Sequence, residues 1–90
     1  MSDAFDLVIV QAEAAKRGVL TMWTVYEKPK DYPIGWIARM FEVTGAGPKP
    51  TNHVIKCAEL EPIRMKLARA GLIRFPRQDG DEPQIVETWL

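Results

Sequence analysis

Alternation of apolar and polar residues in the first half of the chain predicts two β-strands. The first runs from Val19 to Glu27 and is rich in β-branched and aromatic residues. The second follows Gly35, and in it Ile37, Arg39, Phe41 and Val43 alternate with Trp36, Ala38, Met40 and Glu42. Pro29 and Pro33 separate the segments by a loop of about eight residues. We therefore expect two facing strands with a different set of side chains on each face.

Two segments have the periodicity and the end signals of helices. Residues 3–17 begin with Ser2 or Asp3 as N-cap and end at Gly18. In the second, Pro62 is expected at the first helical position and Gly71 ends the helix. Its apolar stripe consists of Leu60, Ile63, Leu67 and Ala70.

The remaining strands are short and separated by loops. Gly and Pro residues predict a loop over Thr44–Asn52, and the β-branched run His53–Cys57 predicts a third strand. Residues 72–75 are extended and suit a short additional strand, and Gln84–Trp89 is the last strand. The expected fold class is α+β, a mainly antiparallel sheet of four or five strands with two helices, in the order α-β-β-β-α-β.

Length and composition indicate one globular domain over residues 1–90. Met22 can itself be a start codon, in which case residues 1–21 form an N-terminal helical extension packed on the core. The charges of twelve basic and twelve acidic residues cancel. This argues against a molecule whose overall charge attracts nucleic acid or an anionic membrane. The one cysteine, Cys57, excludes an intrachain disulfide. With no apolar run of bilayer length and no basic leader, we expect a cytoplasmic protein without membrane association.

Several motifs along the chain resemble those of one group of proteins. They are W-T-V-Y-x-x-P-x-D-Y-P over Trp23–Pro33, A-R-x-F-E-V over Ala38–Val43, L-x-x-I-R over Leu60–Arg64, G-L-I-R-F-P-R over Gly71–Arg77 and I-V-E-T-W over Ile85–Trp89. In these motifs the chain resembles a group of small uncharacterised bacterial proteins. The resemblance leaves the N-terminal helix outside and implies no activity and no catalytic residues.

Residues suited to catalysis or metal binding are sparse. His53 and Cys57 at spacing i, i+4 lie ~13 Å apart on a strand, and a structural zinc site needs four ligands. The acidic residues Asp79, Asp81 and Glu82 lie in a loop with Gly80 and Pro83, where solvation explains them. Gly45–Pro48 lacks the spacing of a phosphate-binding loop. The sequence thus predicts no metal site, no cofactor and no catalytic residues.

An aromatic and basic surface over residues 28–39 is the strongest candidate for binding. Aromatic and arginine side chains are enriched at protein interfaces, and sheet edges must be blocked or paired. The residues expected to contribute are Lys30, Tyr32, Trp36, Arg39 and Arg77. We expect a non-enzymatic module that binds a protein partner or self-associates as a homodimer. Nucleic-acid binding on the same surface is the alternative, since bases stack on aromatic side chains. A small enzyme ranks third.

Overall fold

The predicted order of helices and strands is the order that the chain adopts. The computed structural model describes residues 7–27, 33–77 and 85–90, and within these ranges it contains two helices and five strands. The elements are α1 (Leu7–Lys16), β1 (Leu20–Glu27), β2 (Trp36–Thr44), β3 (Gly47–Cys57), α2 (Leu60–Arg69), β4 (Arg74–Pro76) and β5 (Ile85–Trp89). The α+β class is confirmed, and β4 is the short additional strand expected near residues 72–75.

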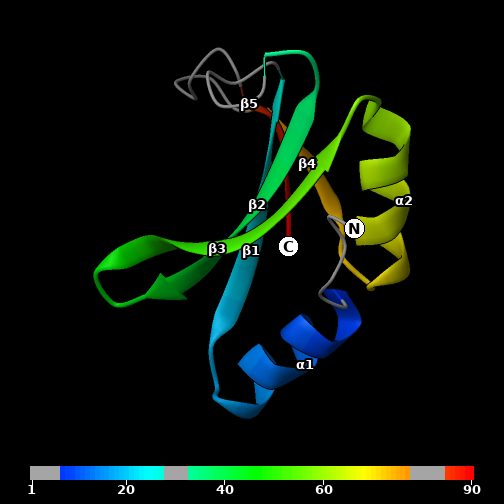
Figure 1. The fold of residues 1–90 in the computed structure, drawn as a ribbon. Helices are drawn as coiled ribbons and strands as arrows, with labels where there is room; N and C mark the ends of the chain where they lie inside the picture. The colour runs from blue at the N-terminus through cyan, green and yellow to red at the C-terminus, as the bar shows by residue number, and fades with distance from the viewer. Residues whose placement is uncertain (1–6, 28–32, 78–84) are drawn as a thin grey trace.

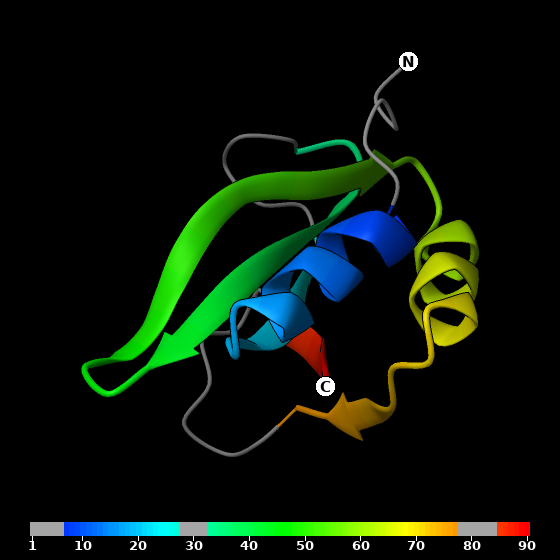
Figure 2. The same ribbon diagram turned by 90° about the horizontal axis from the view of Figure 1, so that it is seen from below.

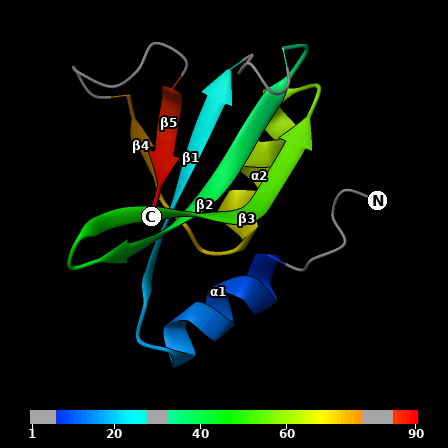
Figure 3. The same ribbon diagram turned by 60° about the vertical axis from the view of Figure 1, so that its left-hand side comes forward.

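The strands form one antiparallel sheet in the order β3-β2-β1-β5-β4 (Figures 1 and 3). β1 is the central strand, and it pairs with β2 from Leu20 opposite Val43 to Glu27 opposite Trp36. On its other side β1 pairs with the end of the chain, where Trp23 lies opposite Trp89. β5 in turn pairs with β4. The C-terminal strand is therefore enclosed between β1 and β4.

One face of the sheet is packed against the helices and forms the core. Trp23 and Val25 of β1 are buried there together with side chains of β2, β3 and β5. The buried cluster consists of Val10, Trp23, Val25, Ala38, Met40, Ile55, Ile63, Leu67 and Trp89. Val10 comes from α1, and Ile63 and Leu67 come from α2. Since the helices supply these contacts, we call this side the helix face and the opposite side the outer face (Figure 2).

Both predicted helix-ending glycines have the backbone geometry that the sequence suggests. Gly18 after α1 has φ 71° and Gly71 after α2 has φ 86°, a region that favours glycine. Leu72 N–H donates to the Leu67 carbonyl at 3.2 Å, and Val19 N–H donates to the Ala14 carbonyl at 2.9 Å. These are the hydrogen bonds of the Schellman motif, which reverses the chain at the end of a helix.

α1 is held on the sheet by polar contacts as well as by packing. The Gln11 side-chain oxygen accepts hydrogen bonds from Thr21 Oγ1 and from Trp23 Nε1, both at 2.9 Å. At the end of the helix, Arg17 forms a 3.0 Å ion pair with Glu42 of β2. The contact between Gln11 and Trp23 satisfies the indole N–H of a fully buried tryptophan.

The prediction of a loop over Thr44–Asn52 is wrong for most of these residues, because they belong to a strand. β3 begins at Gly47 and pairs with β2, with Pro48 opposite Val43 and Pro50 opposite Phe41. Proline is tolerated because β3 is an edge strand, where a missing N–H need not interrupt a ladder. The start of the second helix was also misplaced: Pro62 was expected at its first position, whereas α2 begins earlier, at Leu60.

The register of β3 shifts between Arg39 and Phe41 of its partner strand. Thr51 bridges this irregularity: its Oγ1 donates to the Met40 carbonyl at 2.7 Å, and its carbonyl accepts from Arg39 Nη1 at 2.7 Å. Beyond this point the ends of β2 and β3 form a hairpin arm, residues 41–50, that projects away from α2 (Figures 1 and 2).

Candidate functional site

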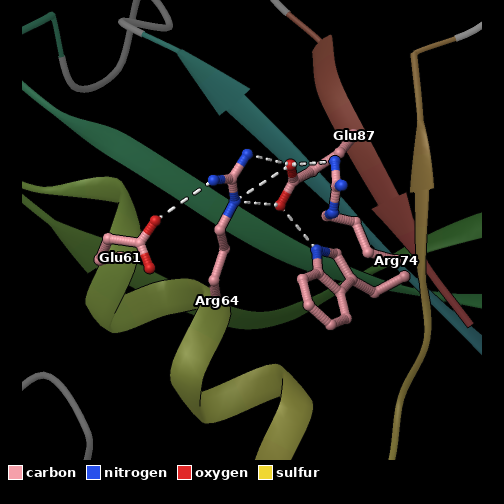
Figure 4. A network of polar contacts seen from close by, with 5 residues as sticks. Glu61, Arg64, Arg74 and Glu87 are labelled. Atoms are coloured by element: carbon pink, nitrogen blue, oxygen red, sulfur yellow. Dashed lines mark hydrogen bonds and ion pairs between the residues drawn. The ribbon is translucent and has the colours of Figure 1, made fainter.

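A buried carboxylate lies at the centre of a network of polar contacts that joins α2, β4 and β5 (Figure 4). Glu87 of β5 points to the helix face, and its side chain is 1% exposed. Arg64 of α2 donates to it through Nη2 at 2.7 Å and through Nε at 3.1 and 3.2 Å. Trp89 Nε1 donates to Glu87 Oε2 at 2.8 Å. Arg74 of β4 lies 3.7 Å away, and Glu61 pairs with Arg64 at 3.2 Å.

The network keeps Glu87 ionised. Burial by itself raises the pKa of this carboxyl, but the hydrogen bonds from Arg64 and Trp89 outweigh it, so that the pKa lies below the ordinary value. The hydrogen bond to Glu87 likewise raises the pKa of Arg64. A general acid or base near neutral pH needs the opposite shift, and a reacting group needs access. The geometry therefore indicates a structural connection between α2, β4 and β5.

The outer face of the sheet has a different character. Register and alternation place rows of side chains across the strands. One row joins Pro48, Val43 and Leu20, and the next joins Pro50, Phe41 and Met22. Ile73 and Leu90 exchange both backbone hydrogen bonds at 2.9 and 3.0 Å, and continuing the register by one residue places Leu90 beside Met22. The second row thus crosses the whole sheet without a polar side chain.

These two rows, together with the neighbouring Phe75, form what we call the outer apolar patch. Its members are Leu20, Met22, Phe41, Val43, Pro48, Pro50, Ile73, Phe75 and Leu90. The exposed fractions of Leu20, Ile73, Leu90, Phe75 and Val43 range from 72% down to 36%. Contiguous exposed apolar surface of this kind is typical of interaction sites.

The next two rows of the outer face contain more polar residues, and some of their side chains are buried. One joins Val54, Arg39, Thr24, Thr88 and Phe75, and the other joins Lys56, Ile37, Tyr26 and Ile85. Thr24 and Ile37 are buried. Arg39 and Lys56 are the charged side chains of these rows, and no carboxylate belongs to them among the described residues. The patch is therefore bordered on the β2–β3 side by positive charge.

The residues predicted for binding do not share one surface. Trp36 lies opposite Cys57 on the helix face and packs against the core, whereas Arg39 lies on the outer face. Arg77 is exposed immediately after β4. Lys30 and Tyr32 lie outside the described residues. Among the predicted binding residues that the structure describes, Arg39 thus lies in the row next to the outer apolar patch.

The outer apolar patch was not predicted from the sequence, although part of its signal was present. Ile73 and Phe75 flank Arg74 and therefore share one face of their segment, and Met22 alternates with Trp23, so that segment has apolar residues on both faces. What was missing was the pairing of β4 with β5 and of β5 with β1, which brings Ile73, Leu90 and Met22 into one row. Such pairing joins segments far apart along the chain.

Other candidate chemistry is weak in the described residues. His53 and Cys57 lie in β3, and no cluster of three or more His, Cys, Asp or Glu side chains suited to a metal ion occurs within residues 7–27, 33–77 and 85–90. In the same ranges, neither α1 nor α2 has the length and apolar character needed to span a bilayer.

Comparison with models of known protein families, with characterised proteins and with solved structures finds no match to this chain. The surfaces described above are therefore what bears on its function.

Proposed function

We propose that this protein is a non-enzymatic protein-interaction module whose contact surface is the outer face of the sheet. The surface consists of the outer apolar patch with Arg39 on its border. It overlaps the aromatic and basic surface expected over residues 28–39 through Arg39, and it extends that surface across β1, β5 and β4. The single cysteine suits a reducing compartment such as the cytoplasm.

The observation that carries the proposal is the uninterrupted apolar row from Pro50 through Phe41 and Met22 to Leu90 and Ile73. The helix face already provides the core of the domain, so burial of this row is not needed for packing α1 and α2. An antiparallel sheet with one solvated face normally alternates apolar and polar residues. Apolar residues on the second face are thus explained by contact with another macromolecule.

Nucleic-acid binding is the second candidate, and one observation favours it. Tyr26, Phe41 and Phe75 lie on the outer face with Arg39 and Lys56, a combination that can stack bases and contact phosphates. The aliphatic and proline side chains of the patch argue for protein instead, since they offer neither stacking planes nor charge. Zero net charge points the same way.

The proposal is tested by comparing what three immobilised proteins capture from an extract of the source cells. They are the wild type, the double variant Leu20→Lys/Ile73→Lys and the control Met65→Lys. Leu20 and Ile73 are 72% and 65% exposed, so the fold should tolerate lysine at both positions. Met65 is 50% exposed on α2, on the other side of the sheet.

We expect the wild type and Met65→Lys to capture the same proteins and the double variant to lose them. Identical capture by all three, with unchanged circular dichroism, would contradict the outer face as the contact surface. Binding of single-stranded RNA or DNA that weakens steeply with salt would instead favour the second candidate, because released counterions drive such binding.

A further inference from the structure

We infer that the partner seated on the outer face is a second copy of this chain, packed sheet on sheet about a two-fold axis that runs along β1. This inference rests on the proposed function and names its partner. It follows from the position of β1 at the centre of the sheet and from the order of the rows that cross it.

The position of β1 makes the outer face self-complementary. A two-fold axis along the central strand places the β2–β3 half of one copy on the β5–β4 half of the other. Each row then meets the same row of the second copy. In the apolar row, Met22 faces Met22, Phe41 faces Leu90, and Pro50 faces Ile73. Leu20 faces Leu20 near the edge of the contact.

The same axis keeps Arg39 away from like charge. Arg39 and Lys56 both belong to the β2–β3 half of the outer face. Opposite Arg39 the axis places Thr88 of the second copy, which carries no charge, whereas Lys56 comes over the end of β4, where the exposed Arg77 follows Pro76. Arg39 moreover donates to the Thr51 carbonyl at 2.7 Å within its own chain, so a carboxylate from a partner is not required to satisfy it. An acidic partner is therefore less well supported than a second copy.

The hairpin arm extends the contact. It carries Phe41, Val43, Pro48 and Pro50 of the patch. The arm projects away from α2 (Figure 2). In the proposed arrangement the arm lies over Ile73 and Leu90 of the second copy, whose side chains are 65% and 49% exposed.

The size of the patch indicates a weak dimer. Strands lie ~4.8 Å apart and rise ~3.4 Å per residue, so a patch crossing from β3 to β4 and running from Leu20 to Thr24 covers on the order of 400 Å². A standard stable interface buries roughly 800 Å² per partner. Since the patch has about half that size, we expect a weak and reversible dimer.

The test is the solution mass by light scattering from about 1 μM to about 1 mM. The wild type should rise from the monomer mass of 10.2 kDa toward twice that value. Leu20→Lys and Leu20→Glu should each raise the dissociation constant at least tenfold, because like charges then meet across the axis. Mixed in equal amounts, they should restore the dimer as a heterodimer. Met65→Lys should behave as the wild type.

A wild type that stays at 10.2 kDa throughout overturns the inference. If capture by the outer face survives in that case, the proposed function stands with a foreign partner, whereas loss of both removes the proposed function too. A dimer that persists in Leu20→Lys and Ile73→Lys but is lost in Met65→Lys also overturns the inference, since it uses another surface. Failure of the mixed variants to associate, when each alone is monomeric, overturns the axis along β1.

Discussion

At the scale of single residues, Glu87 is a charged side chain that is buried in the core. A carboxylate that is withdrawn from water must be compensated, and Arg64 and Trp89 provide hydrogen bonds to both of its oxygens. Every buried side-chain polar atom in the described residues has a hydrogen-bond partner. The network therefore contributes to the specific arrangement of α2 over β5, since any shift of the helix breaks several of these contacts.

Removing Arg64 should be costly because Glu87 would stay buried without the hydrogen bonds that compensate its burial. For Arg64→Met we expect the free energy of unfolding to fall by about 3–5 kcal/mol, a large share of the stability of a small domain. Urea denaturation measures this. Arg74→Met is the matched control: Arg74 is half-exposed and 3.7 Å from the carboxylate, so its loss should cost under about 1 kcal/mol. Equal losses in the two variants would contradict the assigned role of Arg64.

The lowered pKa of Glu87 predicts how stability depends on pH. A carboxyl whose pKa is lower in the folded chain than in the unfolded chain stabilises the fold above the ordinary pKa of 4.5. That contribution is lost as the pH falls from there through the folded pKa. Unfolding free energies measured between neutral and acidic pH should therefore fall more steeply in the wild type than in Glu87→Gln. Parallel curves for the two proteins would refute this assignment.

Among the helices and strands, the ends of the helices were predictable and the length of β3 was not. Gly18 and Gly71 mark turns that depend on a few consecutive residues, which is why the sequence identifies them. β3 contains Pro48 and Pro50, which locally favour a loop. Pairing with β2 outweighs that preference because proline can occupy an edge strand.

Replacing Gly71 tests the turn after α2. An alanine there must adopt φ near 86°, which costs roughly 1–2 kcal/mol for a residue with a Cβ atom. We expect Gly71→Ala to lower the free energy of unfolding by this amount, measured in urea. Its Cβ would meet no atom within 4 Å, so the effect is conformational and not steric.

Gly45→Ala is the matched control for this prediction. Its Cβ would also meet no atom within 4 Å, and its φ lies outside the left-handed region. We expect unchanged or slightly raised stability, because alanine reduces the freedom of the unfolded chain. A loss as large as that of Gly71→Ala would show that the backbone at Gly71 is not the cause.

For the molecule as a whole, association through the outer apolar patch should respond to salt as a hydrophobic contact does. Sodium sulfate strengthens burial of apolar surface, whereas sodium chloride mainly screens charges. We expect the dimer dissociation constant to fall in sulfate and to change little between low and moderate chloride. Sedimentation equilibrium measures both. Weakening by chloride would indicate that charges, and not the patch, hold the copies together.

The candidate surface was predictable only in the part that belongs to one strand. Alternation along β2 separates Arg39 and Phe41 from Trp36, and the folded chain keeps them on opposite faces. The alternation does not say which set faces the helices. The sequence therefore predicts Trp36 and Arg39 alike as binding residues, although Trp36 packs against the core.

Features that depend on near neighbours could be inferred from the amino-acid sequence alone: the α+β class, the order of elements, the helix-ending glycines and the division of β2 into two faces. They follow from local backbone preferences and side-chain periodicity. The strand order, the ionic contact between Arg64 and Glu87 and the row that joins Phe41 to Ile73 became visible only in the folded chain. These depend on pairing between distant segments, which is selected by the packing of the whole core and not by local sequence.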